Sequence, residues 1–293
     1  MNPGARSRVW LNGRLVPAFR ARVSVFDRGF LFGDGVYETM RAYAGRPFRL
    51  AQHLDRLGAS AWRLDLRLPG GRRGAARAVR SVLAANRLGD ARVRVTVTRG
   101  AGPAELGKTA PARPTMLAVA VPYSPPSPRE YREGVGVILA RTRRNPREAL
   151  DPAIKSNNLI NNMLAKMEAA RAGARDAIFL NIAGHLAEGS TSNVFLVDGG
   201  VLMTPALSCG ILPGVTRAAV IGLARRMGMV VREGRFTPHD LARADEVFLT
   251  ASTVELLPVG RIGRRRLPAA RPVTARLLAG YRALVARELG LRR

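Results

Sequence analysis

A proline-rich stretch near the middle of the chain constrains the architecture most. Prolines stand at positions 122, 125, 126 and 128. Proline fixes its φ angle and lacks the N–H group that helices and sheet ladders use, so neither a helix nor a strand continues through this stretch. The 293 residues are also enough for two hydrophobic cores. We therefore predict a domain of residues 1–121, a linker of residues 122–130 and a second domain of residues 131–293.

Strand and helix patterns alternate on both sides of this stretch. Residues Ala91 to Thr98 read ARVRVTVT, an alternation that puts three valines on one face of a half-buried strand. The other predicted strands are residues 8–11, 15–16, 116–121, 136–140, 177–181, 193–197 and 246–250. The predicted helices are residues 49–64, 73–86, 158–172 and 216–227, and one more helix begins near residue 273. This alternation predicts a two-domain α/β or α+β fold.

The chain is strongly basic, with a formal net charge of +27 at pH 7. Such a charge is common in proteins that bind nucleic acid or other anions. Here the arginines are spread from end to end, and few aromatic residues stand among them. This distribution favours a solvated, arginine-rich surface over a nucleic-acid interface. Anionic small-molecule substrates fit the charge equally well, and a basic nucleic-acid-binding protein is the alternative from another class.

Cysteine and histidine are scarce in this chain. Its one cysteine, Cys209, excludes an internal disulfide and suits the reducing cytoplasm. The three histidines lie far apart and show no metal-ligand spacing with Cys209, so we expect no metal site. The first residues lack the apolar core of a signal peptide, and no apolar stretch reaches membrane-spanning length. We therefore expect a cytoplasmic protein without a membrane partner.

Lysine is also rare. Only three of the 48 basic residues are lysines, namely Lys108, Lys155 and Lys166. Arginine stays protonated at physiological pH, whereas a lysine amine can lose its proton and form a Schiff base with a carbonyl group. Because arginine supplies nearly all of the generic positive charge, this composition favours a chemical role for one of the lysines.

Lys108 lies in a segment that imitates a nucleotide-binding loop. Residues Gly102 to Thr109 match the motif G-x-x-x-x-G-K-[ST]. The motif requires a helix directly after it, since the helix N-terminus holds the phosphates. Pro111 and Pro114 follow instead and prevent that helix. We interpret the segment as a surface loop and not as an ATP or GTP site.

Lys155 is followed by three segments that suit one cofactor. Residues Glu188 to Asn193 read EGSTSN, a carboxylate ahead of small hydrogen-bonding residues. Residues Gly210 to Arg217 read GILPGVTR and enter a helix, whose first N–H groups suit a phosphate. Residues Thr250 to Thr253 add three hydroxyls at the end of a strand. A Schiff-base lysine, a carboxylate for a pyridine nitrogen and phosphate-binding loops are the parts that hold pyridoxal phosphate.

Each segment alone has an ordinary structural interpretation, such as a solvated lysine or a turn before a helix, but the ordered set is far more specific. The set resembles the fold-type IV pyridoxal-phosphate enzymes, which include branched-chain aminotransferases, D-amino acid aminotransferases and aminodeoxychorismate lyases. The resemblance covers about residues 12–258. Its further motifs are Asp27-Arg28-Gly29-Phe30, Gly33-Asp34-Gly35-Val36-Tyr37-Glu38-Thr39, His53-Leu54-Asp55-Arg56-Leu57 and Glu255-Leu256-Leu257-Pro258.

The resemblance implies a fold, a cofactor and a set of residue roles. The implied fold has a small N-terminal α/β domain and a larger C-terminal pseudo-barrel domain, with pyridoxal 5′-phosphate between them in a homodimer. Lys155 would be the catalytic residue that binds the cofactor as a Schiff base and moves a proton between the substrate Cα and the cofactor C4′. Glu188 would pair with the pyridine nitrogen. The other implied cofactor-binding residues are Arg56, Ser192, Asn193, Val215, Thr216 and Ser252, and the implied substrate-binding residues are Tyr37, Arg94 and Ala251.

Within the family, the resemblance favours an aminotransferase that acts on aliphatic or branched-chain L-amino acids with 2-oxoglutarate. The R-x-H pair of the well-known D-amino acid aminotransferases is absent, since the corresponding loop reads Ala104-Glu105-Leu106. Glu38, which the lyases typically replace, is retained, and Arg94 matches an arginine of the branched-chain enzymes. However, Arg92 stands where those enzymes usually have tyrosine, and Gly33-Asp34-Gly35 is shared with the D-specific and lyase branches. A D-amino acid aminotransferase and an aminodeoxychorismate lyase are therefore the alternatives.

Overall fold

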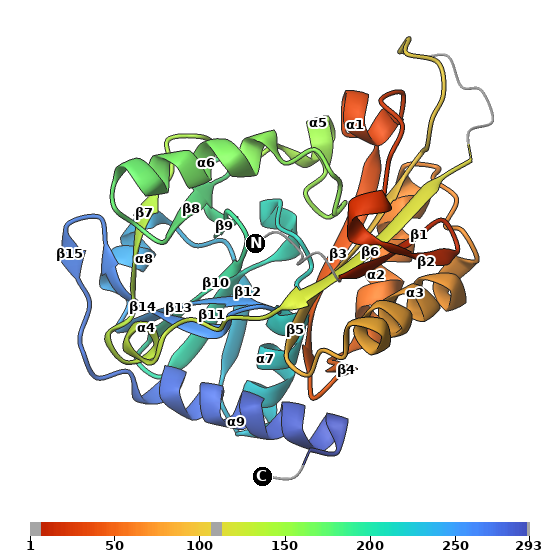
Figure 1. Ribbon diagram of the computed structural model, residues 1–293. Coiled ribbons are helices and arrows are strands. Elements are labelled where there is room, and N and C mark those ends of the chain that lie inside the picture. The colour runs from red at the N-terminus through yellow and green to blue at the C-terminus, as the bar shows by residue number, and fades with distance from the viewer. Residues whose placement is uncertain (1–6, 107–112, 292–293) are drawn as a thin grey trace. The chain divides into compact units, whose positions relative to one another are not determined.

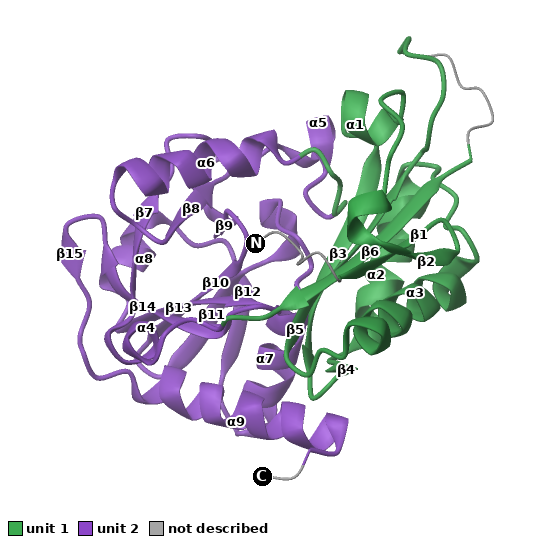
Figure 2. Cartoon of the chain, viewed as in Figure 1, with its two compact units in different colours: residues 1–124, 154–158 green, residues 125–153, 159–293 purple. Residues whose placement is uncertain are grey.

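The computed structural model describes residues 7–106 and 113–291, and the chain divides into two compact units (Figures 1 and 2). The first unit comprises residues 1–124 and 154–158, and the second comprises residues 125–153 and 159–293. The segment 154–158 thus belongs to the first unit although it follows the proline-rich stretch in sequence. This segment carries Lys155, so the N-terminal unit positions that lysine.

The first unit is built on one antiparallel sheet, whose strand order is β2-β1-β6-β5-β3-β4. Its strands are β1 (Arg8–Leu11), β2 (Arg14–Pro17), β3 (Gly35–Tyr43), β4 (Arg46–Pro47), β5 (Ala91–Thr98) and β6 (Thr115–Pro122), and its helices are α1 (Arg28–Phe32), α2 (Leu50–Arg63) and α3 (Gly71–Asn86), with a 3-10 turn at Ala18–Arg20. Helices α2 and α3 pack against each other and against the sheet (Figure 1).

Strand β5 shows why this sheet has one apolar face. Val93, Val95 and Val97 are fully buried and form one hydrophobic core with leucines of α2 and alanines and valines of α3. Arg92 is exposed and Arg94 is half-buried, so both arginines lie on the opposite face. The predicted strand and the predicted orientation of its valines are confirmed.

The second unit contains a mixed sheet with the strand order β12-β11-β10-β13-β14-β7-β8-β9, and β15 pairs with β14. Its strands are β7 (Val135–Leu139), β8 (Asp176–Leu180), β9 (Leu186–Gly189), β10 (Asn193–Asp198), β11 (Val201–Pro205), β12 (Val231–Gly234), β13 (Glu246–Ala251), β14 (Glu255–Ile262) and β15 (Arg265–Arg266). The last strand of the order, β9, also contacts β10. The sheet therefore curls back on itself and forms a half-barrel.

Helices cover this half-barrel. They are α4 (Pro128–Glu133), α5 (Arg147–Leu150), α6 (Ile160–Arg171), α7 (Val215–Arg226), α8 (Pro238–Arg243) and α9 (Pro272–Leu289), with a 3-10 turn at Leu207–Cys209. Helix α6 packs on β8, whereas α7 and α9 pack together and contact β13 (Figure 1). The barrel interior is apolar and includes Val137, Ile178, Val194 and Leu249.

The proline-rich stretch separates a strand from a helix. Strand β6 ends at Pro122, and α4 begins at Pro128. Ser127 and Glu130 form a capping box at the start of α4, and proline suits the first helical position because its missing N–H would have no helical partner there. The predicted linker 122–130 therefore includes the last residue of β6 and the first turn of α4.

The strands and helices predicted from the sequence are confirmed, with ends that differ by at most two residues. Strand β3 was not predicted, because Glu38 interrupts the apolar face formed by Val36, Met40 and Ala42. The Arg41 guanidinium is buried over the rings of Tyr43 and Tyr123, at 4.1 and 4.3 Å from their centroids. This packing hides a charged residue at a position that a simple pattern assigns to solvent.

Two further features concern the described residues only. None of their helices combines the length and apolar character needed to cross a membrane. They also contain no group of three or more His, Cys, Asp and Glu side chains that could hold a metal ion.

Lys108 lies outside the described residues, together with the rest of 107–112, so its assignment to a surface loop stays a prediction.

Candidate active site

The backbone of Lys155 is held against strand β3. The Tyr37 N–H donates to the Lys155 carbonyl oxygen at 3.0 Å, and the Asn157 N–H donates to the Gly35 carbonyl oxygen at 2.8 Å. The Lys155 N–H donates to Ser60 Oγ on α2 at 3.1 Å. These hydrogen bonds fix the position from which the lysine side chain extends.

Gly35 makes this close approach possible. A Cβ atom at position 35 would lie 2.7 Å from the Asn157 Nδ2 atom and 2.7 Å from the Val97 carbonyl oxygen. A methyl group at this position would therefore push the lysine segment away from β3 or distort the pairing with β5. The Gly-Asp-Gly motif thus has a packing function at its second glycine.

Two cations contact the ring of Tyr37. The Lys155 Nζ atom lies 4.6 Å from the ring centroid, and the Arg94 Cζ atom lies 3.6 Å from it. Arg94 also donates from Nε to Thr96 Oγ1 at 3.2 Å and from Nη2 to Asn157 Oδ1 at 3.3 Å. Burial lowers the pKa of Arg94, but an arginine side chain remains protonated at neutral pH. The structure thus gathers an amine and a fixed guanidinium around one aromatic ring.

Arg56 forms a buried ion pair with Glu38. The Arg56 Nε atom lies 2.7 Å from Glu38 Oε1, and its Nη2 atom lies 2.9 Å from Oε2. His53 Nδ1 lies 2.7 Å from the same Oε2. Helix α2 supplies both His53 and Arg56, which are three positions apart and therefore lie on one side of the helix. The phosphate-binding role of Arg56 stays a prediction.

Glu38 is ionised in this cluster. Burial by itself would raise the pKa of Glu38, but the Arg56 guanidinium and the His53 hydrogen bond outweigh it and lower the pKa to about 2. Burial lowers the pKa of His53 in spite of the neighbouring carboxylate. The cluster therefore holds an anionic Glu38, a cationic Arg56 and a neutral His53.

The ionisation of Glu38 predicts a specific acid sensitivity. As the pH falls below the ordinary pKa of 4.5, the unfolded chain takes up a proton at Glu38, whereas the folded chain does not until about pH 2. Stability is therefore lost across this window, by about 3 kcal/mol. Denaturant unfolding from about pH 6 to about pH 2 should show this loss in the wild type and not in Glu38→Gln. Parallel stability curves for the two proteins would contradict the assignment.

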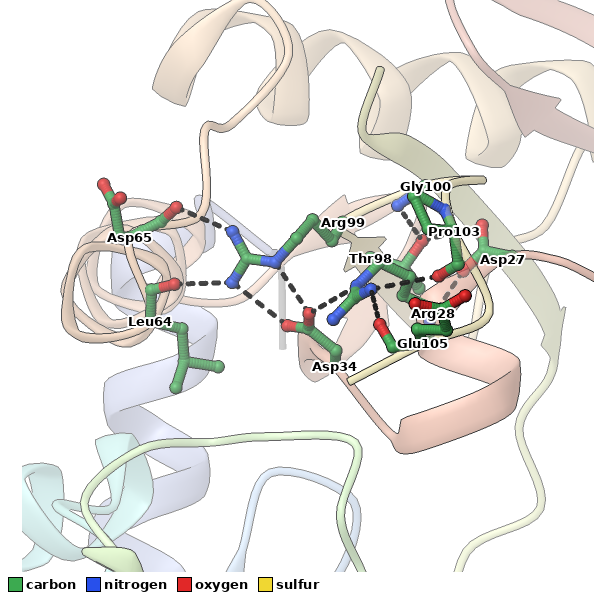
Figure 3. Close-up of polar contacts among 11 residues, drawn as sticks. Asp27, Arg28, Asp34, Leu64, Asp65, Thr98, Arg99, Gly100, Pro103 and Glu105 are labelled. Carbon is green, nitrogen blue, oxygen red and sulfur yellow. Dashed lines mark hydrogen bonds and ion pairs between the residues drawn. The ribbon is translucent and has the colours of Figure 1, made fainter. Parts of the chain in front are cut away.

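A second ion-pair network fixes the loop before β3 (Figure 3). Arg99 donates to both carboxylate oxygens of Asp34, at 2.6 and 3.1 Å, and to the carbonyl oxygens of Leu64 and Asp65 at the end of α2. Arg28 Nε lies 3.5 Å from Asp34. The Asp34 carboxylate thus links helix α1 to the residue after β5, and Arg99 extends this network to the residues after α2. The network supports the loop from which β3 begins.

In the second unit, Glu188 is the third residue of strand β9 and is 4% exposed. Its Oε1 atom lies 2.9 Å from Arg144 Nη2. Its Oε2 atom accepts hydrogen bonds from Asn193 Nδ2 at 3.2 Å and from the Leu212 N–H at 3.0 Å. The guanidinium and the two N–H donors compensate this buried carboxylate, an arrangement that suits a partner for a pyridinium nitrogen.

Arg144 is a residue that the sequence analysis missed. Its guanidinium is buried and also donates to Asn161 Oδ1 at 3.0 Å and to Asn162 Oδ1 at 3.3 Å on α6. Its Cζ atom lies 5.3 Å from the Phe179 ring centroid. In a chain rich in arginine, no sequence signal separates this one from its solvated neighbours. It is the positive partner that allows Glu188 to be buried.

The start of α7 and the end of β13 lie near Glu188 in the fold. Gly214 is the N-cap of α7 and has no side chain to cap the first N–H groups of the helix. Asn193, which contacts Glu188, is paired with Thr250 in the sheet. The Thr250 Oγ1 atom is buried and has no hydrogen-bond partner among the described residues. A helix start with glycine at the N-cap, an unused hydroxyl and a buried carboxylate fit a pyridine ring that carries a phosphate.

Ser192 and Lys166 have structural partners. Ser192 Oγ donates to Asp176 Oδ2 at 3.0 Å, and Lys166 Nζ lies 3.5 Å from Asp176 Oδ1. The Ser192 hydroxyl is therefore directed to Asp176, and its role in cofactor binding stays a prediction. The ion pair with Asp176 gives Lys166 a structural role, whereas Lys155 is the candidate for Schiff-base chemistry.

The structure thus groups the predicted site residues within each unit. The first unit holds Tyr37, Arg56, Arg94 and Lys155, and the second holds Glu188, Ser192, Asn193, Val215, Thr216, Ala251 and Ser252. In the second unit, Glu188, Asn193 and the segment that enters α7 are joined by hydrogen bonds.

Comparison with known proteins identifies the family. A family model described as amino-transferase class IV matches residues 35–262. The chain is 42% identical over 258 residues to the "Putative branched-chain-amino-acid aminotransferase" of Methanocaldococcus jannaschii, with 88% of each chain covered. It is 36% identical over 274 residues to the D-alanine aminotransferase of Listeria innocua, with 92% of this chain and 93% of that protein covered.

Solved structures agree with this assignment. The branched-chain aminotransferase of the thermophilic archaeon Thermoproteus uzoniensis, solved with norvaline, matches with a TM-score of 0.90 and 32% identity, over 98% of this chain and 96% of that one. The expected two-domain fold-type IV architecture is thereby confirmed. With a family model that spans most of the sequence and relatives that align along nearly all of it, the chain belongs to the class IV aminotransferases.

Proposed function

We propose that this protein is a pyridoxal 5′-phosphate-dependent aminotransferase that moves the amino group of aliphatic or branched-chain L-amino acids to 2-oxoglutarate. The observation that carries the proposal is the pair of cations on Tyr37, with Lys155 Nζ at 4.6 Å and Arg94 Cζ at 3.6 Å from the ring centroid. An amine can form a Schiff base and transfer protons, and a positioned guanidinium can bind a carboxylate. An amino acid carries a carboxylate that the guanidinium can bind and a Cα proton that the amine can transfer.

The chain supplies groups for each part of the cofactor. Bound pyridoxal 5′-phosphate provides an electron sink for the charge that develops on the substrate Cα. Glu188, which contacts Arg144, would accept a hydrogen bond from the protonated pyridine nitrogen and so keep that nitrogen protonated. Arg56, Thr216 and Ser252 would bind the phosphate, together with the first N–H groups of α7. Lys155 would bind the cofactor carbonyl carbon and move a proton between the substrate Cα and that carbon.

A substrate panel tests the proposal against its alternatives. The purified holoenzyme is offered L- and D-amino acids with 2-oxoglutarate and with pyruvate, and its visible spectrum is recorded. We expect a visible cofactor band and the highest kcat/KM for L-valine, L-leucine and L-isoleucine. Turnover of D-alanine or D-glutamate alone would favour the D-specific alternative. Release of pyruvate from aminodeoxychorismate would favour the lyase, and the absence of any visible band would favour a nucleic-acid-binding protein.

Arg94 is the proposed anchor of the substrate carboxylate. We expect Arg94→Ala to raise KM for the amino acid by about tenfold or more, since a bidentate contact worth roughly 1.4 kcal/mol is lost. Arg92→Ala is the matched control, because Arg92 lies on the same face of β5 but is exposed. Its KM should stay within about twofold of the wild-type value. Equal KM values for Arg94→Ala and the wild type would exclude Arg94 as the anchor.

The proposal includes a homodimer. Ile160, Met163, Leu164 and Met167 are 68%, 54%, 47% and 45% exposed. Their spacing puts all four on one side of α6, and an exposed apolar stripe of this kind marks a contact surface. A second copy of the chain is the proposed partner. The proposed compartment is the cytoplasm, which would keep Cys209 reduced. Sedimentation equilibrium should give the mass of two chains, and a mass of 31.6 kDa would contradict this assembly.

A further inference from the structure

Strand β3 and helix α2 enclose a cluster of three ionisable side chains. Glu38 has a side-chain exposure of 0%, His53 of 1% and Arg56 of 11%. Burial of a carboxylate is costly unless it is paired. A buried ion pair is commonly no more stabilising than an apolar core of the same volume. Stability alone therefore does not account for a complete ion pair at this position.

The geometry of the cluster restrains the Arg56 guanidinium. Two parallel N–H···O contacts, from Nε to Oε1 at 2.7 Å and from Nη2 to Oε2 at 2.9 Å, fix both the position and the plane of the guanidinium. A single hydrogen bond would leave the plane free to rotate. The long arginine side chain thereby loses most of its conformational freedom before any ligand binds.

His53 in turn restrains the Glu38 carboxylate. An ionised carboxylate only accepts hydrogen bonds, so the neutral His53 ring donates its Nδ1 proton to Glu38 Oε2 across 2.7 Å. His53 is neutral because burial lowers its pKa, and the charges of Arg56 and Lys155 lower it further. The cluster therefore lies within electrostatic reach of Lys155, the residue that would bind the cofactor.

The Glu38 carboxylate that holds Arg56 is fully enclosed, whereas the Arg56 side chain keeps 11% exposure. An anion that approaches from the exposed side meets a guanidinium that is already oriented and already desolvated on its inner edge. Preorganisation of this kind raises affinity because the cost of ordering the side chain has been met during folding. Phosphate oxygens match the guanidinium geometry as well as carboxylate oxygens do.

We infer that Glu38 and His53 are positioning residues that hold Arg56 in the orientation in which it binds the cofactor phosphate. The inference rests on the proposed function, because Arg56 is a phosphate ligand only if the cofactor is pyridoxal 5′-phosphate. It assigns Glu38 to cofactor binding and not to substrate choice, although Glu38 is one of the residues on which the subfamily assignment depends.

The test compares two aldehydes that differ only in the phosphate. Full-length apoprotein is titrated with pyridoxal 5′-phosphate and with pyridoxal. The dissociation constant for pyridoxal divided by that for pyridoxal 5′-phosphate is a ratio that measures phosphate discrimination. We expect Glu38→Gln to lower this ratio by about tenfold or more, with little change for pyridoxal. Arg56→Met should lower it at least as much. Asp55→Asn is the matched control, since Asp55 lies next to Arg56 on α2 but is exposed and pairs with Arg72 of α3.

A double-variant cycle separates positioning from a general loss of structure. If Glu38 acts through Arg56, Glu38→Gln combined with Arg56→Met should lower the ratio no further than Arg56→Met alone, to within about twofold. Glu38→Asp covers the case in which the Gln variant does not fold. It keeps the buried charge but withdraws the carboxylate from Arg56 by one methylene, and we expect an intermediate ratio with a thermal unfolding midpoint close to that of the wild type.

The outcomes separate the inference from the proposed function. An unchanged ratio in Glu38→Gln, or in Glu38→Asp if the Gln variant does not fold, together with a lowered ratio in Arg56→Met, would overturn the inference and leave the cofactor assignment intact. An unchanged ratio in Arg56→Met would remove Arg56 from the phosphate site and overturn the inference as well. A wild-type protein that binds neither aldehyde would contradict the proposed function itself.

Discussion

Lys155→Ala should eliminate both transamination and the visible absorption of a bound Schiff base. Loss of a positioned acid–base group typically lowers the rate by roughly 10²- to 10⁴-fold. Here the same substitution also removes the amine that binds the cofactor covalently, so we expect a loss at the upper end of this range or beyond. The alanine variant should still fold, because the hydrogen bonds of residue 155 to Tyr37 and Ser60 use its backbone atoms.

The other two lysines are the controls for this variant. Lys166 Nζ is 3.5 Å from Asp176 Oδ1, and the Lys166 side chain is 40% exposed, so Lys166→Ala should cost some stability and leave turnover within about twofold. Lys108→Ala should also leave turnover unchanged. Visible spectra and single-turnover kinetics of all three variants provide the measurement. A Lys155→Ala protein that keeps the visible band would exclude Lys155 as the Schiff-base residue.

Glu188→Gln should retain the cofactor and slow the amino-acid half-reaction by at least about tenfold, equivalent to a barrier about 1.4 kcal/mol higher. The amide has the same shape as the carboxylate but carries no charge to keep the pyridine nitrogen protonated. Without that proton, the ring accepts electron density less well. Stopped-flow recording of the cofactor band measures this step directly.

The surroundings of Glu188 support the same expectation. Oε1 faces the Arg144 guanidinium at 2.9 Å, and Oε2 faces two N–H donors, on Asn193 and Leu212. An amide nitrogen in either position would meet a donor, so one buried contact becomes unfavourable whichever way the amide turns. A normal half-reaction rate in Glu188→Gln would remove this residue from the site.

Local patterns predicted the elements with clear periodicity. Elements without a prediction include the strands β9, β11, β12 and β14 and the short helices α1, α4, α5 and α8. The eight residues of β5 alternate strictly because one face enters the core and the other carries Arg92 and Arg94. Strand β3 escaped prediction because Glu38, which pairs with Arg56, lies on its apolar face. Residues 154–158 could not be assigned to the first unit from the sequence, because their pairing with β3 joins residues more than a hundred positions apart.

The candidate site was predictable where a rare residue type marked it. Lys155 stands out because lysine is scarce, and Glu188 stands out because small polar residues follow it. The partners of these residues were not predictable. Arg144 is one arginine among many, and the pairing of Glu38 with Arg56 depends on how α2 packs on β3. Tertiary packing decides which charges meet, and a sequence pattern carries no such information.

The most direct test of the account is to locate the cofactor on the wild-type chain. Borohydride reduces a Schiff base to a stable secondary amine, so treatment of the holoenzyme leaves a pyridoxyl group on the lysine that bound the cofactor. Peptide mapping by mass spectrometry then identifies that lysine. The account predicts a single labelled peptide that contains Lys155. A label on Lys108 or Lys166, or no label on a protein that shows the visible band, would contradict it.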